Sequence, residues 1–156
     1  MEIDFVITWV DMNDAEWQRD FVKYSNKTEN EKNSVSKARF RDYGLLKFWF
    51  RGVEKFAPWV RKIHFVTCGQ KPEWLDENHL KINFVDHKNF IPEQFLPSYN
   101  SVVIERYLHK IPDLAEHFVY FNDDFYIIND IDKSRFFQNG LPCDISIFQY
   151  NPNWSQ

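Results

Sequence analysis

Runs of mainly apolar, β-prone residues alternate along the chain with stretches in which apolar residues recur at helical spacing. The apolar runs lie at residues 3–10, 62–68, 80–85 and 118–121. The helical spacings lie at residues 15–22, in a long helix that opens at 39–42 and stops at Pro58, in a short helix at 73–75, and at 99–109. This order predicts an α/β fold with a mainly parallel sheet and flanking helices. The first run has too little polar alternation for an exposed sheet face, so we expect a central strand covered on both sides.

The segment at residues 25–37 breaks this pattern. Val35 is its only sizeable apolar residue, and the segment shows no periodicity. We expect a mobile surface loop there. Beside a ligand site such a loop can act as a lid, although a plain solvated connection is the more frequent role.

The last apolar run stops abruptly on Asn122, Asp123 and Asp124. We expect a buried strand that delivers two carboxylates to the carboxyl edge of the sheet, where open α/β sheets bind ligands. Adjacent carboxylates suit Mg²⁺ or Mn²⁺, which can bridge to phosphate oxygens. The alternative is a polar turn that closes the strand, because Asn and Asp favour turns.

The turn after the first strand carries further polar candidates. Thr8, Asp11 and Asp14 can hydrogen-bond to the base, the ribose or a metal of a bound nucleotide. Asp14 can equally cap the helix that follows it. No glycine-rich GxGxxG pattern occurs here, so a dinucleotide site of that type is not indicated.

Arginine residues gather around the start of the long helix. Arg39, Arg41 and Arg51 supply planar, forked donors that suit phosphate, and Asp42 can orient one of them. The alternative for each arginine is ordinary surface ion pairing.

His87 follows Asp86 after the third apolar run. It can serve as a general base or a metal ligand, although a lone loop histidine is more often exposed and idle.

Composition narrows the class of protein. The chain has 156 residues, of which 44% are hydrophobic and 19% aromatic, which indicates one globular domain over residues 1–156. A net charge of -4 with acids and bases interspersed argues against a nucleic-acid partner. Cys68 and Cys143 lack CxxC spacing, and no apolar stretch reaches membrane-spanning length, so we expect a cytoplasmic location without a transmembrane segment. No oligomeric state is predicted.

Collinear motifs along most of the chain resemble the Stealth family of hexose-1-phosphate transferases. Residues 3–11 resemble its first conserved region, and residues from Arg39 to Asp124 resemble its second. The matching positions of the second region are 39–42, 51, 53–55, 57–63, 66, 67, 69, 70, 72, 74, 75, 85–87, 96, 97, 100, 101, 104, 105, 108, 109, 111, 112, 120 and 122–124.

The resemblance implies a nucleotide-sugar-binding fold like that of the GT-A glycosyltransferases. It also implies transfer of a sugar 1-phosphate, typically from a UDP-linked donor, to a sugar hydroxyl of a saccharide acceptor, which forms a phosphodiester in a capsular or surface polysaccharide. With the motifs placed on this chain, Thr8, Trp9, Asp11 and Asp14 are the expected donor-binding residues.

The expected reacting centre combines these motifs with the demands of phosphoryl transfer. Asp123 and Asp124 would hold Mg²⁺ or Mn²⁺ on the diphosphate, and Arg39 or Arg51 would offset the charge that develops on phosphate. Asp42 and Asn100 would position these groups or the acceptor. The general base is unassigned.

The chain also departs from the family pattern. Met12 and Asn13 stand where the family often has Gly and Ser, and Leu45 replaces a common acid. The family's third and fourth regions are not evident in residues 126–156, so the chain is either a fragment or an abbreviated member. Two alternatives therefore stay open: a metal-dependent glycosyltransferase, and a truncated non-catalytic domain that binds a nucleotide sugar or a partner chain.

Overall fold

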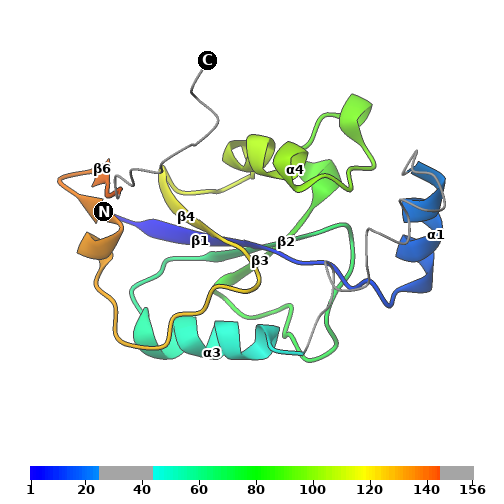
Figure 1. Cartoon of the computed structure of the whole chain (residues 1–156). Helices are drawn as coiled ribbons and strands as arrows, with labels where there is room; N and C mark the ends of the chain where they lie inside the picture. Colours follow the sequence, from blue (N-terminus) through cyan, green and yellow to red (C-terminus); the bar gives the residue numbers. More distant parts are fainter. Residues whose placement is uncertain (25–43, 145–156) are drawn as a thin grey trace, which may run out of the picture.

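Four parallel strands form the central sheet of the computed structural model, which describes residues 1–24 and 44–144 (Figure 1). The strands are β1 (Ile3–Thr8), β2 (Ile63–Thr67), β3 (Ile82–Asp86) and β4 (His117–Phe121), in the order β3-β2-β1-β4. The predicted α/β class with a mainly parallel sheet and flanking helices is confirmed, and the arrangement is consistent with a GT-A-like fold. The loop predicted at 25–37 lies outside the described residues.

β1 is central, as its sequence predicts, because it pairs with β2 on one side and β4 on the other. Ile3, Phe5 and Ile7 enter the core on one face of the sheet, whereas Val6 enters the core on the opposite face. β4, in contrast, lies at an edge of the sheet formed by the described residues, and all its residues are half-buried. The prediction of a buried last strand is therefore wrong, because an edge strand keeps one side open.

Helix α3 (Leu46–Phe56) covers the face that carries Phe5 (Figure 1). Trp49 and Val53 of this helix are buried against the sheet. The long helix was predicted to open at 39–42, but α3 begins only at Leu46. It follows Gly44, whose φ of 69° interrupts helical geometry. It ends at Phe56, close to the predicted stop at Pro58.

Gly52 permits a close approach between α3 and the chain after β4. A Cβ atom at this position would lie 2.5 Å from the carbonyl oxygen of Ile127. Ile127 is itself buried in the core on this face of the sheet. The absence of a side chain at Gly52 therefore lets the backbone of the segment after β4 pack directly against α3.

The opposite face is covered by short helices from the second half of the chain. They are η1 (His87–Asn89), η2 (Glu93–Phe95), α4 (Ser101–Tyr107) and η3 (Leu108–Lys110). Leu108 and Ile111 are buried there with Val6, Val66 and Val85. Val102 of α4, within the helix predicted at 99–109, is 67% exposed and does not enter this core.

Residues 68–81, between β2 and β3, contain turns instead of the helix predicted at 73–75. The amide of Leu75 donates to the carbonyl of Pro72, which closes one such turn. The chain after β4 adds η4 (Lys133–Arg135) and a short antiparallel pair, β5 (Phe137–Gln138) and β6 (Leu141–Pro142).

Helix α1 (Ala15–Tyr24) packs on the body of the protein through aromatic rings. None of its residues is buried. Trp17 and Phe21 both meet the ring of Tyr99 in edge-to-face contacts, with centroids 5.7 and 5.4 Å away, and Tyr24 stacks on it at 6.5 Å. The predicted apolar face of this helix thus has one partner in common, the ring of Tyr99.

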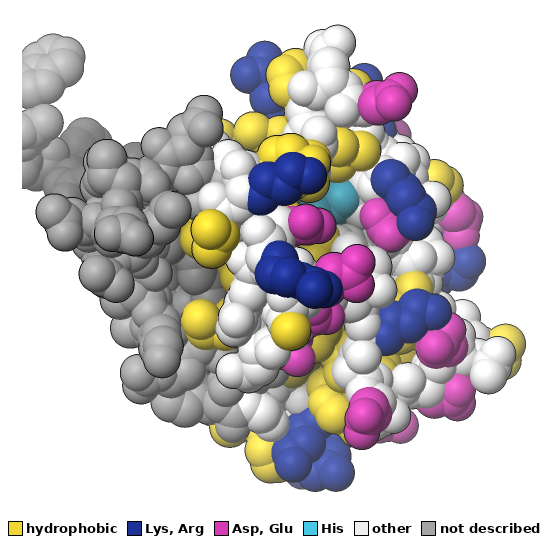
Figure 2. All heavy atoms as spheres, turned by 90° about the vertical axis from the view of Figure 1, so that its right-hand side faces the viewer, with side chains coloured by type: hydrophobic (Ala, Val, Ile, Leu, Met, Phe, Trp, Pro, Cys, Tyr) yellow, Lys and Arg dark blue, Asp and Glu magenta, His cyan; other side chains and the backbone are white. Residues whose placement is uncertain are grey.

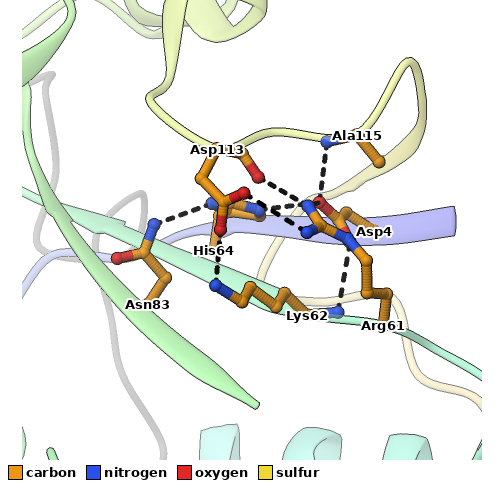
Figure 3. A network of polar contacts seen from close by, with 7 residues as sticks. All are labelled: Asp4, Arg61, Lys62, His64, Asn83, Asp113 and Ala115. Atoms are coloured by element: carbon orange, nitrogen blue, oxygen red, sulfur yellow. Dashed lines mark hydrogen bonds and ion pairs between the residues drawn. The ribbon is translucent and has the colours of Figure 1, made fainter. Parts of the chain in front are cut away.

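A buried ion-pair network fastens the amino ends of the strands (Figure 3). Asp4 is fully buried in β1, and both of its carboxylate oxygens accept hydrogen bonds from Arg61, at 2.9 and 2.6 Å. The amides of Lys62 and Ala115 also donate to this carboxylate. Although burial opposes it, this set of donors holds the pKa of Asp4 below its ordinary value of 3.8.

His64 extends the same network across the sheet. Its Nε2 lies 2.9 Å from Asp4 Oδ2, and its Nδ1 lies 3.0 Å from the side-chain amide of Asn83 (Figure 3). Burial lowers the pKa of His64, so the ring is neutral and donates from Nε2 to the carboxylate. Asp113 closes the network at the surface by pairing with Arg61 and Lys62.

None of the helices that the structure describes combines the length and the apolar character needed to cross a bilayer.

Candidate functional site

The carboxyl ends of the parallel strands meet at the edge opposite the buried ion-pair network, and Figure 2 faces this edge. Lysine, arginine and acidic side chains are interspersed over it, with a histidine showing between them. The loops that follow the strands contribute several of the polar residues predicted from the sequence: Asp11, His87, Asp123 and Asp124. This edge is therefore the candidate site.

Asp123 and Asp124 lie in the turn directly after β4, and both are exposed. The amide of Phe125 donates to the carbonyl of Asn122 at 3.2 Å, so the polar turn of the alternative interpretation is present. Across the described residues, no group of three or more His, Cys, Asp or Glu side chains could hold a metal. Two exposed carboxylates still suit Mg²⁺, which keeps several waters and is commonly held by one or two carboxylates plus substrate phosphates. The metal role stays a prediction.

A chain of hydroxyl contacts joins β1, β4 and α4 beside this pair. Thr8 Oγ1 lies 3.1 Å from the hydroxyl of Tyr120, which donates to Glu105 Oε1 at 3.5 Å. Burial raises the pKa of Tyr120, and the negative charges of Glu105 and Asp123 raise it further. Thr8 is thereby placed next to the strand that carries the acids. Tyr120 was missed as a site residue, although its place two residues before Asn122 is a signal for it.

The other predicted donor-binding residues have structural contacts of their own. Trp9 is half-buried, and its ring lies 5.8 Å from that of Phe65. Asp14 Oδ1 accepts hydrogen bonds from the amides of Glu16 and Trp17, at 2.8 and 2.9 Å, and the bond from Trp17 lowers the pKa of Asp14. Asp14 thus caps α1, and any contact of Trp9 or Asp14 with a donor stays a prediction.

Asp11 fixes the loop after β1 to the loop after β2. Its amide donates to Gln70 Oε1 and its carbonyl accepts from Gln70 Nε2, both at 2.8 Å. Its carboxylate accepts from the amide of Asn13. The structure therefore brings Asp11 and Thr8 to the same edge of the sheet as Asp123 and Asp124.

The remaining predicted catalytic residues are not brought together in the described structure. Arg39 and Asp42, with Arg41, lie outside the described residues. Arg51 is exposed on α3, where its guanidinium carbon lies 5.4 Å from the ring centroid of Phe48, and it pairs with no acid in the described part of the chain. Asn100 caps α4 by accepting from the amide of Val102 at 3.0 Å.

A pocket of about 340 Å³ opens at the carboxyl ends of β2 and β3. His87 lines it, and burial lowers the pKa of this histidine to about 4 despite the nearby charge of Asp86. His87 is therefore neutral at physiological pH. The sequence singled out His87 but not Tyr99, which lines the same pocket.

Comparison with known proteins finds two matching family models. "Stealth protein CR2, conserved region 2" matches residues 39–144, and "Stealth protein CR1, conserved region 1" matches residues 1–29.

Curated relatives match almost the whole chain. The chain is 49% identical over 143 residues to the receptor polysaccharide phosphotransferase WefC of Streptococcus oralis, and the match covers 90% of the chain and 43% of WefC. It is 45% identical over 157 residues to the capsular polysaccharide phosphotransferase eps5J of Streptococcus thermophilus, covering 99% of the chain and 65% of eps5J. It is 46% identical over 147 residues to the capsular polysaccharide phosphotransferase WcwK of Streptococcus pneumoniae, and the match covers 94% of the chain and 44% of WcwK. The chain thus spans between 43% and 65% of the length of these relatives.

Proposed function

Because the chain belongs to the Stealth family, we propose that it acts in transfer of a sugar 1-phosphate from a nucleotide sugar, with UDP as the expected nucleotide, to a sugar hydroxyl. The product is a phosphodiester link in a capsular or surface polysaccharide. The names of the relatives support phosphotransfer in polysaccharide synthesis. The observation that carries the proposal is the exposed Asp123 and Asp124 pair at the carboxyl end of β4, inside the matched second region.

In this reaction the acceptor hydroxyl oxygen bonds to the phosphorus that bears the sugar. The bond from that phosphorus to the bridging oxygen breaks, the nucleoside monophosphate leaves with that electron pair, and the hydroxyl proton passes to a base or to solvent. The chain's task is to align the reactants and to balance negative charge, because a loose transition state leaves little covalent work for side chains.

Asp123 and Asp124 would hold Mg²⁺ or Mn²⁺, which would neutralise charge on the diphosphate when bound. Thr8 and Asp11 lie at the same edge and would contact the donor. Arg39 or Arg51 would balance the charge on the transferred phosphate, and Asp42 and Asn100 would orient these groups or the acceptor. In the described structure Asn100 has a structural contact, because its side chain caps the start of α4.

The test is binding of a panel of UDP-sugars by calorimetry, with and without Mg²⁺ or Mn²⁺, to the wild-type protein and to Asp124→Asn. Asp130→Asn is the matched control, because Asp130 is also an exposed acid in the chain after β4. We expect metal-dependent binding that Asp124→Asn abolishes and Asp130→Asn retains. Metal-dependent binding that survives in Asp124→Asn would contradict the metal role of Asp124. Absence of binding by the folded wild-type protein would contradict the proposal that a UDP-sugar is the donor.

The released nucleotide separates this reaction from that of a metal-dependent glycosyltransferase. Sugar 1-phosphate transfer releases UMP, whereas attack at the anomeric carbon releases UDP. Chromatography of the nucleotide products, with saccharide acceptors present, distinguishes the two. UDP as the sole product would overturn the proposed reaction but not the donor site.

A further inference from the structure

The pocket at the carboxyl ends of β2 and β3 is separate from the acidic pair on β4. It is lined by Cys68 after β2, by residues 86–88 at the end of β3 and in η1, by Glu93 of η2, and by residues 96–99 after η2. Its volume of about 340 Å³ is near the lower end for small-molecule sites, which is enough for one ring system but not for a whole nucleotide sugar.

The walls of this pocket suit a flat, uncharged ring. Leu96, Pro97 and Tyr99 contribute apolar and aromatic surface. Burial raises the pKa of Tyr99 to about 12 and that of Cys68 to about 11, so neither side chain ionises at neutral pH. Although Asp86, Lys88 and Glu93 also line it, the pocket therefore offers a ring-sized space with apolar and aromatic surface, of the kind in which heterocycles stack on aromatic side chains.

His87 adds directional hydrogen bonding to these walls. Its ring nitrogens form no hydrogen bond with the described residues, and its neutral imidazole presents one donor and one acceptor. The carboxylate of Asp86, in contrast, is already paired with Lys88, whose amide and ammonium both lie within 3.1 Å of it. His87 is thus a wall residue with unused capacity to hydrogen-bond a ligand.

The aromatic wall is held in place before any ligand arrives. Tyr99 is contacted by Trp17, Phe21 and Tyr24, which together form the aromatic face of α1. Edge-to-face and stacked contacts of this kind fix a ring's orientation. A preformed wall lowers the cost of ordering the site on binding.

The distance to the acidic pair matches the dimensions of a nucleotide donor. In the order β3-β2-β1-β4, the pocket lies over the first two strands and Asp123 and Asp124 follow the last. Neighbouring strands lie about 4.8 Å apart, so the pocket and the pair are separated by roughly 10 to 14 Å across the sheet. A nucleoside diphosphate can span this separation between its base and its second phosphate.

We propose that this pocket binds the nucleobase of the donor, with the base against Tyr99 and Pro97 and its polar edge hydrogen-bonded to His87. The proposal rests on the proposed function, since it places one part of the same donor. The diphosphate then runs across the loops joined by Gln70 and Asp11 toward Asp123 and Asp124. His87 and Tyr99 become the residues that distinguish one base from another.

The test compares two ligands that share a diphosphate but differ in the base. Dissociation constants for UDP and for inorganic pyrophosphate are measured with Mg²⁺ on the wild-type protein, His87→Ala and Tyr99→Leu. Phe95→Ala is the matched control, because Phe95 is an exposed ring in the same stretch that does not line the pocket. We expect UDP binding to weaken roughly ten-fold or more in both pocket variants, with pyrophosphate and the control unchanged.

A second measurement needs no variant and is independent of any effect of Tyr99→Leu on the packing of α1. Irradiation of the wild-type protein with 4-thiouridine diphosphate should attach the base to a peptide containing residues 86–88 or 96–99. Attachment elsewhere would overturn the base site, as would equal UDP affinity in wild type and both pocket variants. In either case UDP binding by the wild type would leave the proposed function standing, whereas absence of UDP binding overturns both proposals.

Discussion

Gln70 and Asp11 join the first two loops of the carboxyl edge through a closed pair of hydrogen bonds. The Asp11 amide donates to Gln70 Oε1 and Gln70 Nε2 donates to the Asp11 carbonyl, each at 2.8 Å. The side chain of Gln70 thus pairs with the backbone as a neighbouring strand would, beyond the point where β1 and β2 end. The two loops keep the spacing of the strands that precede them.

Gln70→Glu tests this pair with a minimal change of shape. A carboxylate can still accept from the Asp11 amide but cannot donate to the Asp11 carbonyl, so we expect a loss of about 1 to 2 kcal/mol in the free energy of unfolding. Urea denaturation measures it. Gln94→Glu is the control, because Gln94 is exposed on η2 and should change stability little. Equal stability of the two variants would show that the pair does not tie the loops together.

Asp4→Asn tests the buried network at the amino ends of the strands. The substitution keeps the side chain's size but leaves Arg61 without its buried counter-charge and turns one acceptor into a donor. Removing one member of a buried pair typically costs about 3 to 5 kcal/mol, and we expect a loss of that order in chemical denaturation. Asp113→Asn alters the exposed member of the same network and should change stability far less than Asp4→Asn. A small effect at both positions would contradict a stabilising role for the network.

Gly52→Ala tests the close approach between α3 and the chain after β4. The new Cβ would meet the Ile127 carbonyl oxygen at 2.5 Å, so backbone must shift, and we expect a loss of about 1 to 3 kcal/mol despite the better helix propensity of alanine. Thermal or urea unfolding measures the loss. Glu54→Ala, at an exposed position of the same helix, supplies the comparison. A more stable Gly52→Ala variant would mean that the backbone at Ile127 can move away from the new Cβ atom at little cost.

His87 should make the protein less stable in mild acid. Its folded pKa of about 4 lies below its ordinary value of 6.5, so the unfolded chain binds the proton more readily. The contribution of neutral His87 is full above pH 6.5 and is lost as the pH falls toward 4, by on the order of 3 kcal/mol.

An NMR titration of the histidine ring protons, with His87→Gln to assign the signal, measures this pKa directly. We expect the His87 resonance to titrate near pH 4, and the stability of His87→Gln to fall less than that of the wild type between pH 6.5 and 4. A His87 midpoint close to 6.5 would show that the ring is solvated and would remove the expected acid sensitivity.

The sequence predicts the strands of this fold well and the helix boundaries less well. Apolar runs mark the four strands because a covered parallel strand needs apolar residues on both faces. The start of α3 was placed too early because the sequence around Arg39 does not reveal that Gly44 adopts a left-handed φ. The short helix expected at 73–75 is replaced by turns, where local spacing over a few residues is a weak signal.

The site is predicted in part. Strand-end polarity led to Thr8, Asp11 and Asp124, which share one edge because parallel strands end together. The pocket was not foreseen, because His87 and Tyr99 come from segments twelve residues apart whose approach depends on how η1 and η2 fold over the sheet. The sequence shows Asp4 as an acid inside an apolar run, which indicates a buried carboxylate. Its partner, Arg61, could only be found from the structure.

The central place of β1 has a consequence for how the chain is synthesised. The ribosome makes β1 before the other three strands of the sheet, but its partner β4 begins at His117 and pairs with Ile3–Ile7 only after β2 and β3 have been made. Until then one edge of this mainly apolar strand lacks its final neighbour, and an unpaired edge of this kind can pair with other chains. Slower elongation before residue 117 should therefore increase the demand for chaperones, without altering the stability of the finished protein.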